Sequence, residues 1–327
     1  MRAVVLESYG GPEVLTVRDV ADPEPGPDDV VVEIVSAALN RADLLQRMGF
    51  YPGPPMPHEI PGMELAGRVV AAGERATRWS VGDPVMGIVG GGAYAERIAV
   101  HERQLLPVPA SIPLADAGAV PEVFLTAWDA LVVQGGLTSG RHALIHAGAS
   151  GVGTAAIQIA RVLGARVIVT TSSGKVAACR DLGADLVVDY GAEDFVAEAK
   201  AFTGGEGVDV VLDVIGGDYL ARNLDALRVR GHIVQVGVMG GGSATFPLGA
   251  MLGKRASLTG TVLRARPLEE KIALTQRFER ELLPFLADGS CRPVIDSRFA
   301  LAEVADAHRY METNANVGKI VLDVGSS

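Results

Sequence analysis

The chain has 327 residues, of which 48% are hydrophobic and 21% charged, a composition typical of a folded protein large enough for two domains. Its 29 Lys and Arg residues against 39 Asp and Glu residues give a net charge of -10, which argues against nucleic acid as a partner. Two cysteines exclude a disulfide framework and a four-thiolate zinc lobe. The first apolar run is too short for a signal peptide and no stretch has the length of a membrane span, so we expect a cytoplasmic protein without a membrane partner.

The first hundred or so residues contain short apolar segments closed by Gly, Pro and other turn residues. Short strands at this spacing are typical of an all-β, barrel-like unit. The expected strands cover residues 3–8, 15–20, 29–39, 65–73, 83–89 and 93–100.

From about Leu114 the pattern changes. Residues 114–132 have helical periodicity that Pro121 interrupts, and from there strands and helices alternate strictly. Apolar strands separated by helices indicate βαβ units and a parallel sheet, and six such strands match a doubly wound dinucleotide-binding (Rossmann) sheet of the α/β class. We expect these strands at 142–148, 165–171, 185–190, 208–216, 232–237 and 256–263, and helices at 154–164, 174–183, 192–202, 219–229 and 246–252.

The C-terminal part of the chain is too short for a domain of its own. It reads as one long helix over 267–289, a helix over 301–314 and a final strand over 318–324. We expect these pieces to pack on the N-terminal unit. The predicted domains are therefore 1–120 with 266–327, and 121–265.

The strongest local signal is the glycine-rich turn "LIHAGASGVGTAAIQIA" at 144–160, with the spacing G-x-x-G-x-G. Glycine allows a tight turn and close approach to a pyrophosphate, whose charge the first amides of the following helix hold. A nucleophile elbow is improbable because its closing glycine would fall on Val152, and a phosphate loop needs a lysine that is absent. The expected cofactor contacts here are Gly148, Ser150, Gly151, Val152 and Gly153.

The end of the second strand of this sheet indicates the type of cofactor. Where an acidic residue would hold the 2'-hydroxyl of an adenosine ribose, the chain has Thr171, Ser172, Ser173 and then Lys175. Hydroxyls and an ammonium accept a 2'-phosphate that a carboxylate would repel, so the pattern favours NADPH over NADH. A solvated lysine in the first turn of a helix is the other interpretation of Lys175.

Five motifs in order carry a family resemblance: "ALNRADLLQRMGFYPGPP", "PGMELAG", "PEVFLTAWDAL", "HAGASGVGTAAIQIA" and "GKIVL". Together with the domain order, they resemble zinc-free NADPH:quinone oxidoreductases of the medium-chain dehydrogenase/reductase superfamily, most closely the p53-inducible quinone oxidoreductase-like branch. The resemblance spans essentially the whole chain. It implies a GroES-like β-barrel domain beside the Rossmann domain, and NADPH-dependent reduction of a quinone or related conjugated carbonyl.

The resemblance also implies that no metal is bound. Zinc alcohol dehydrogenases of this superfamily carry a Cys where this chain has Asn40, and a His where it has Met63, just before Glu64. An amide oxygen and a thioether do not replace a thiolate and an imidazole as tight zinc ligands. His58 with Glu59 is a less favoured alternative donor pair. We expect Glu64 to hold a neighbouring backbone group or basic side chain.

By the same resemblance, Asn40 and Tyr51 lie beside the nicotinamide, with Asp43 in the same N-x-x-D element. Tyr51 either donates a proton to the developing oxyanion or only forms a pocket wall. Further cofactor contacts are expected at Thr126, Tyr190, Val236, Gly237 and Leu263.

Two other functions stay open, an enone or enoyl-thioester reductase and a redox-silent NADPH-binding protein. The expected partners are a small-molecule quinone or conjugated carbonyl and a second copy of the chain. Relatives form homodimers through the last strand of the Rossmann sheet, which is 256–263 here.

Overall fold

A computed structural model describes residues 1–51 and 53–325 of the chain. The chain divides into two compact units. Unit 1 comprises Met1–Val123 and Arg264–Ser327, and unit 2 comprises Phe124–Leu263. The last two residues of the expected domain segment 266–327 lie outside the described residues.

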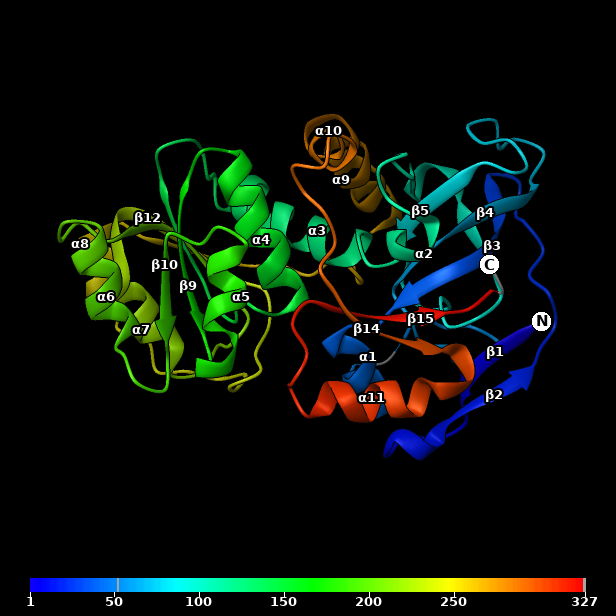
Figure 1. Cartoon of the computed structure of the whole chain (residues 1–327), viewed down its shortest axis with the longest axis horizontal. Helices are drawn as coiled ribbons and strands as arrows, with labels where there is room; N and C mark the ends of the chain where they lie inside the picture. The colour runs from blue at the N-terminus through cyan, green and yellow to red at the C-terminus, as the bar shows by residue number, and fades with distance from the viewer. Residues whose placement is uncertain (52, 326–327) are drawn as a thin grey trace. The chain divides into compact units, whose positions relative to one another are not determined.

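Unit 2 contains a six-stranded parallel sheet of order β10-β9-β8-β11-β12-β13, so the predicted Rossmann sheet is confirmed (Figure 1). Its central strand β11 is buried along its whole length because helices cover a parallel sheet on both faces. Gly164 and Gly183 end helices with φ of +73° and +98°, as expected of C-terminal glycines. The strands are β8 (His142–Ile145), β9 (Arg166–Thr171), β10 (Leu186–Asp189), β11 (Val208–Asp213), β12 (Leu227–Gln235) and β13 (Ser257–Gly260). Helix α3 (Pro121–Trp128) begins in unit 1 and continues in unit 2 with a π-helical extension (Asp129–Gln134). The other helices of unit 2 are α4 (Gly151–Val162), α5 (Val176–Asp181), α6 (Phe195–Phe202), α7 (Tyr219–Ala226) and α8 (Leu248–Lys254).

One helix boundary in unit 2 was predicted wrongly. The helix expected over 219–229 ends at Ala226, and β12 begins at the next residue. The cause is tertiary: Leu227 pairs with Val208 of β11, which extends the backbone where local propensity favours a helix. The register between β11 and β12 shifts after Leu227, and within this stretch Arg230 has a left-handed φ of +65°.

Unit 1 is built on a seven-stranded sheet of order β14-β15-β3-β4-β5-β7, with β6 paired to β3, and on a hairpin of β1 and β2. The C-terminal strand β15 pairs antiparallel with β3, so the end of the chain returns to the sheet of the N-terminal segment. The strands are β1 (Arg2–Leu6), β2 (Leu15–Asp19), β3 (Asp29–Ala38), β4 (Glu64–Ala72), β5 (Pro84–Ile88), β6 (Arg97–His101), β7 (Leu105–Pro107), β14 (Ile295–Ala300) and β15 (Lys319–Asp323).

The helices of unit 1 are α1 (Arg41–Arg47), α2 (Leu114–Ala117), α9 (Leu268–Glu281), α10 (Leu283–Ala287) and α11 (Val304–Glu312). The single long helix expected over 267–289 is therefore wrong. It is divided at Leu282, because Pro284 has no amide to continue the helical hydrogen bonds and is tolerated only in a first turn, here that of α10.

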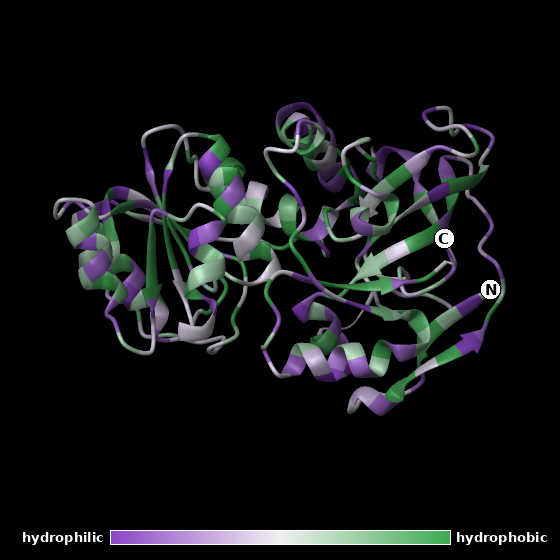
Figure 2. Ribbon diagram, in the orientation of Figure 1, coloured by the Kyte–Doolittle hydropathy of each residue, from purple (hydrophilic) through white to green (hydrophobic). Residues whose placement is uncertain are grey.

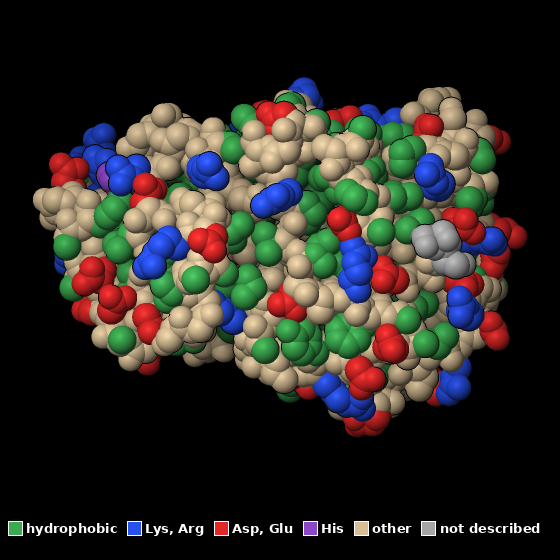
Figure 3. Space-filling model, viewed as in Figure 1, with side chains coloured by type: hydrophobic (Ala, Val, Ile, Leu, Met, Phe, Trp, Pro, Cys, Tyr) green, Lys and Arg blue, Asp and Glu red, His purple; other side chains and the backbone are tan. Residues whose placement is uncertain are grey.

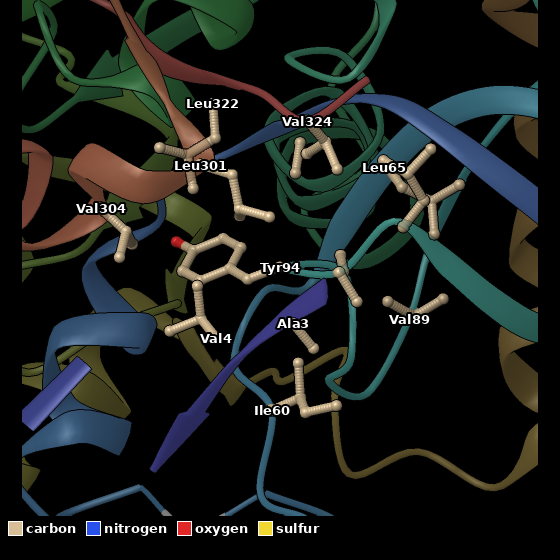
Figure 4. Packing of buried hydrophobic residues seen from close by; sticks show 14 of the residues in the cluster. Ala3, Val4, Ile60, Leu65, Val89, Tyr94, Leu301, Val304, Leu322 and Val324 are labelled. Atoms are coloured by element: carbon tan, nitrogen blue, oxygen red, sulfur yellow. The ribbon is translucent and has the colours of Figure 1, made fainter. Parts of the chain in front are cut away.

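The core of unit 1 surrounds Tyr94, whose ring is fully buried. Figure 4 shows this ring beside Val4, Leu301 and Val304, which come from β1 and from the region of α11. Gly62 lies against the same ring with φ of +96°, and a Cβ there would come within 2.4 Å of the Tyr94 Cδ1 atom. Glycine is therefore required where the "PGM" segment passes the aromatic ring.

Hydropathy follows this architecture. Figure 2 shows hydrophobic residues along the strands of the parallel sheet and a mixture of both kinds along α11, as expected of a helix with one buried face. On the face drawn in Figure 3, acidic and basic side chains are interspersed. No helix among the described residues is long and apolar enough to cross a membrane.

Candidate functional site

A buried carboxylate, Glu64, connects three elements of unit 1. It is the first residue of β4 and is 0% exposed. Its Oε1 atom accepts from Asn40 Nδ2 at 3.0 Å and lies 2.7 Å from Lys319 Nζ. Its Oε2 atom accepts from the backbone amide of Glu122, at 2.9 Å, in the first turn of α3. The sequence predicted that Glu64 holds a backbone group or a basic side chain, and here it contacts one of each.

The basic side chain is Lys319, the first residue of β15, from the "GKIVL" motif. Its ammonium is 3% exposed and lies close to three oxygen atoms: Leu39 O at 2.6 Å, Asn40 Oδ1 at 2.7 Å and Glu64 Oε1 at 2.7 Å. An ammonium has three N–H donors, so all of them are used inside the protein. Sequence reasoning missed Lys319, although the motif that contains it was recognised.

These contacts fix the Asn40 side chain. Its Nδ2 atom donates to Ala38 O at 3.3 Å and to Glu64 Oε1 at 3.0 Å, while its Oδ1 atom accepts from Lys319. Both amide protons are thereby used, and the remaining capacity of Asn40 is a lone pair on Oδ1. This residue can accept a hydrogen bond from a ligand but has no free proton to donate.

Asp43 lies behind Asn40 and is 0% exposed. Its Oδ2 atom accepts from the Asn40 backbone amide at 2.8 Å and from the Tyr94 hydroxyl at 2.9 Å. Burial raises its pKa to about 6, against these hydrogen bonds and the positive charges of Lys319 and Arg264. The structure thus places Asp43 as a support of the α1 N-terminus, shielded from solvent.

The donor set around Glu64 does not fit a zinc ion. Asn40 and Glu64 offer only oxygen atoms as ligands, and Met63 offers a buried thioether. The Lys319 ammonium already contacts Asn40 Oδ1 and Glu64 Oε1. Across residues 1–51 and 53–325, no group of three or more His, Cys, Asp and Glu side chains is arranged to hold a metal ion. The positive charge of this cluster comes from a lysine.

Tyr51 lies in the loop after α1, close to the guanidinium group of Arg264. The Arg264 Cζ atom is 4.9 Å from the centre of the Tyr51 ring, and Arg264 Nη1 donates to the Tyr51 carbonyl at 3.0 Å. Arg264 also donates to Gly90 O and to Gln46 Oε1, so it joins α1 to two loops. Burial raises the pKa of the Tyr51 phenol. The positive charge of Arg264 lowers this pKa, and the negative charge of Glu122 raises it. Within the described part of the chain, the Tyr51 hydroxyl makes no hydrogen bond.

Glu122 is a second residue that sequence reasoning missed. Burial raises its pKa to about 8, and the negative charge of Glu64 adds to the shift. Its Oε2 atom is shielded from solvent and has no hydrogen-bond partner among the described residues. A carboxyl group of this kind is neutral at pH 7, which is unusual for glutamate. No local pattern in "PEVFLTAW" signals this, because the causes are burial in the folded unit and, after it, the charge of Glu64.

In unit 2, the glycine-rich turn has the geometry of a dinucleotide site. Ala147 directly before it has a left-handed φ of +54°, and a Cβ on Gly153 would come within 2.3 Å of Ala147 O. Ser150 caps α4, its Oγ atom accepting from the Gly153 amide at 3.0 Å. The first amides of a helix have no acceptor inside it, so those of Gly151 and Val152 can serve a phosphate. The residues present therefore fit a dinucleotide pyrophosphate.

The end of β9 differs from the expected phosphate site in two ways. Thr171 is buried and its hydroxyl lies against the Cys179 thiol, so it faces the interior. The hydroxyl of Ser173, which is exposed, donates to Asp189 Oδ2 at the end of the neighbouring strand β10. This hydrogen bond lowers the pKa of Asp189 below its ordinary value. A carboxylate thus accepts from Ser173 after all, and it belongs to β10 and not to β9.

The other predicted cofactor residues are spread over unit 2. Thr126 is buried in α3, Leu263 is buried after β13, and Tyr190 is exposed after β10. Val236 and Gly237 follow β12, at the carboxyl edge of the sheet where doubly wound folds bind ligands. A pocket of about 270 Å³ opens beside them; its lining residues include Gly216, Gly217, Gln235, Val238 and Gly260.

Comparisons with known proteins agree with this architecture. Residues 26–110 match the family model of the alcohol dehydrogenase GroES-like domain, and residues 151–282 match that of zinc-binding dehydrogenases. A quinone oxidoreductase of Pseudomonas aeruginosa is 36% identical over 327 residues, covering 98% of this chain and 99% of its own. The crystal structure of Escherichia coli quinone oxidoreductase complexed with NADPH has a TM-score of 0.89 at 29% identity, over 99% of this chain and 100% of that chain. The crystal structure of CurK enoyl reductase has a TM-score of 0.88 at 28% identity, over 99% of each chain.

The buried ion pair between Glu64 and Lys319 is expected to stabilise the fold. Lys319→Met leaves the Glu64 carboxylate buried without its cation, and we expect the free energy of unfolding to fall by about 3–5 kcal/mol. The control is Arg277→Met, which removes an exposed ion pair to Glu281 in α9 and is expected to cost less than about 0.5 kcal/mol. Urea denaturation measures both. Equal losses for the two variants would show that the Lys319 pair contributes no more than a surface pair.

Proposed function

The chain belongs to the medium-chain dehydrogenase/reductase superfamily, as a quinone oxidoreductase-like member, and from this premise we propose that it reduces quinones with NADPH and without zinc. The relatives support the broader activity, NAD(P)-dependent oxidoreduction of a small molecule. One observation carries the finer proposal. Asn40 and Glu64, at positions where the resemblance implies metal-site residues in zinc-dependent relatives, both contact the Lys319 ammonium, whose donors are all used.

When bound, NADPH supplies the hydride. The residues of unit 1 handle the acceptor, whose oxygen becomes anionic as it receives that hydride. Tyr51 supports this role because its phenol has no partner among the described residues and a pKa above its ordinary value, so it is a protonated donor at neutral pH. Asn40 offers a fixed Oδ1 acceptor, which suits an N–H or O–H of the cofactor or substrate. Asp43 supports Asn40 through its backbone amide.

We assign NADPH to the glycine-rich turn, with Ser172, Ser173 and Lys175 near the 2'-phosphate. Asp189 opposes that assignment because its carboxylate accepts the Ser173 hydroxyl and repels a phosphate. We therefore expect the preference for NADPH over NADH to be modest.

An enone or enoyl-thioester reductase is the second candidate, since the CurK enoyl reductase has a similar structure along its whole length. The interspersed charges on the face drawn in Figure 3 and the net charge of -10 do not favour an acyl-CoA, which needs a basic anchoring patch. A redox-silent NADPH-binding protein is the third candidate.

We further propose that the chain forms a homodimer through β13. This strand is the edge of the six-stranded sheet, and its region carries exposed apolar side chains at Leu258 and Val262. Sedimentation equilibrium gives the mass that decides between one copy and two.

Turnover with a panel of acceptors tests the proposed function. Oxidation of NADPH and NADH is followed by absorbance with 1,2- and 1,4-quinones, enones and enoyl-CoA. We expect quinones to give the highest kcat/KM, because a quinone accepts hydride without Lewis-acid assistance. Faster reduction of enones or enoyl-CoA would favour the second candidate. NADPH binding without turnover of any acceptor would leave only the third.

Cofactor preference gives a separate prediction. Asp189→Asn removes the carboxylate beside Ser173, and we expect the ratio of NADPH to NADH affinity to rise about threefold to tenfold at low ionic strength. Glu206→Gln is the matched control, because it neutralises an exposed carboxylate in the loop before β11, at the amino edge of the same sheet. Cofactor fluorescence titration measures both ratios. No change in Asp189→Asn would place the 2'-phosphate away from Ser173.

Tyr51→Phe tests the phenol. If Tyr51 donates a hydrogen bond or a proton to the acceptor oxygen, we expect kcat for quinone reduction to fall about a hundredfold while NADPH affinity stays unchanged. Steady-state kinetics combined with cofactor titration separates the two effects. An unchanged kcat would assign Tyr51 to the pocket wall alone.

A further inference from the structure

A buried polar network crosses the carboxyl edge of the parallel sheet in unit 2, and the reaction described above gives it no role. Its members are each at most 1% exposed: Thr170 in β9, His146 directly after β8, Asn223 in α7 and Asp213 at the end of β11. Thr170 Oγ1 lies 2.9 Å from His146 Nδ1, and His146 Nε2 lies 2.7 Å from Asn223 Oδ1. Asn223 Nδ2 donates to Asp213 Oδ2 at 2.8 Å. The network therefore joins four elements that are distant in sequence.

The hydrogen bonds of this network have one direction. A carboxylate only accepts, so the Asn223 amide turns its NH₂ group to Asp213 and its oxygen atom to His146. His146 Nε2 then carries a proton, which it donates to that oxygen. Burial lowers the pKa of the imidazole, so His146 is neutral at pH 7 and its Nδ1 atom accepts from the Thr170 hydroxyl. His146 is therefore the Nε2–H tautomer.

At one end, the network holds the strained residue of the glycine-rich turn. Ala147 has a left-handed φ of +54°, a conformation that is costly for a residue with a Cβ atom and persists only where its surroundings enforce it. Thr170 holds the residues on both sides of Ala147. Its hydroxyl bonds the His146 side chain, and its carbonyl accepts from the Gly148 amide at 2.9 Å. The entry to the expected pyrophosphate site is thereby fixed against β9.

At the other end, Asp213 holds the two loops that follow β11 and β12. Its Oδ1 atom accepts from the amides of Ile215 and Gly216, at 2.6 and 3.0 Å. Its backbone carbonyl accepts from the amides of Val236 and Gly237, at 2.7 and 3.3 Å. Val236 and Gly237 are expected cofactor contacts, and Gly216 lines the pocket beside them. The network thus ends on backbone that borders the expected cofactor site.

We propose that the buried polar network positions the cofactor site, because it fixes the glycine-rich turn relative to the loops after β11 and β12. The inference rests on the nicotinamide dinucleotide binding that is part of the proposed function, and it is independent of the acceptor. Thr170, His146, Asn223 and Asp213 are positioning residues, since they act on the cofactor through the backbone of the turn and the loops.

The test compares the affinities of Asn223→Leu for NADPH and for its fragment 2',5'-ADP, by titration calorimetry. The substitution has a similar shape and removes the links to both His146 and Asp213. We expect the dissociation constant of NADPH to rise about tenfold. That of 2',5'-ADP should rise clearly less, because the fragment lacks the nicotinamide and the second phosphate of the pyrophosphate. Equal losses for the two ligands, or no loss for either, would overturn the inference.

Two isosteric substitutions give a matched pair. Thr170→Val removes the hydroxyl that bonds His146. Thr259→Val, the control, removes a hydroxyl that lies 2.8 Å from His232 Nε2, where β12 pairs with β13 outside the network. We expect the first to raise the NADPH dissociation constant about threefold and the second to leave it unchanged. If Asn223→Leu fails to fold, this pair decides, and equal constants for both variants would contradict the positioning role.

Nitrogen NMR separates this inference from the proposed function. Without cofactor at pH 7, His146 should show a protonated Nε2 and an unprotonated Nδ1, identified by the signals that disappear in His146→Gln. The opposite tautomer, or a mixture of the two, overturns the inference whether or not a cofactor binds. If NADH binds more tightly than NADPH, the comparison uses NADH and 5'-AMP. If the tautomer is as assigned but neither dinucleotide binds, the proposed function fails, and the positioning role with it, while the direction of the hydrogen bonds stands.

Discussion

The organisation of unit 1 depends on the buried ion pair between Glu64 and Lys319. Removing two charges from water is expensive, and such a pair is maintained only where hydrogen bonds satisfy the remaining donors and acceptors. Both ions meet that condition: the ammonium has three oxygen partners and the carboxylate has Asn40, Lys319 and the Glu122 amide. Because the pair joins β4 to β15, it ties the C-terminal return of the chain to the beginning of α1 and α3.

The same pair determines the chemistry available at this position. A lysine is a fixed point charge that orients Asn40, but it has no open coordination position for a substrate oxygen. A neutral hydrogen-bond donor is then needed to stabilise the anionic oxygen of the acceptor. The Tyr51 phenol, whose ring lies next to the Arg264 guanidinium, can be that donor. Lys319 is engaged by Glu64, and burial together with the negative charge of Glu64 outweighs the nearby cations and raises the pKa of Glu122 to about 8.

The sequence predicted the elements of the fold best where the pattern is local and repeated. The six strands of the Rossmann sheet are continuous apolar runs and the glycine-rich turn has a fixed spacing, so both were found from neighbouring residues. Errors arose where tertiary pairing or one imino acid overrode a helical pattern, at Leu227 and at Pro284. Cofactor type shows the same limit, since the end of β9 has no acid in its sequence, whereas Ser173 donates to Asp189 of the neighbouring strand β10.

Taken alone, the sequence determined the family, the order of the two units, and the replacement of the Cys and His zinc ligands by Asn40 and Met63. These depend on residue identity and spacing, which a chain displays directly. Only the tertiary structure decided that Lys319 supplies the cation, that Glu122 is neutral and that Asp189 meets Ser173. Lys319 is 279 residues from Asn40, and a pKa is set by whatever charges and solvent surround a group in space. Such contacts exist only once strands distant in sequence have paired.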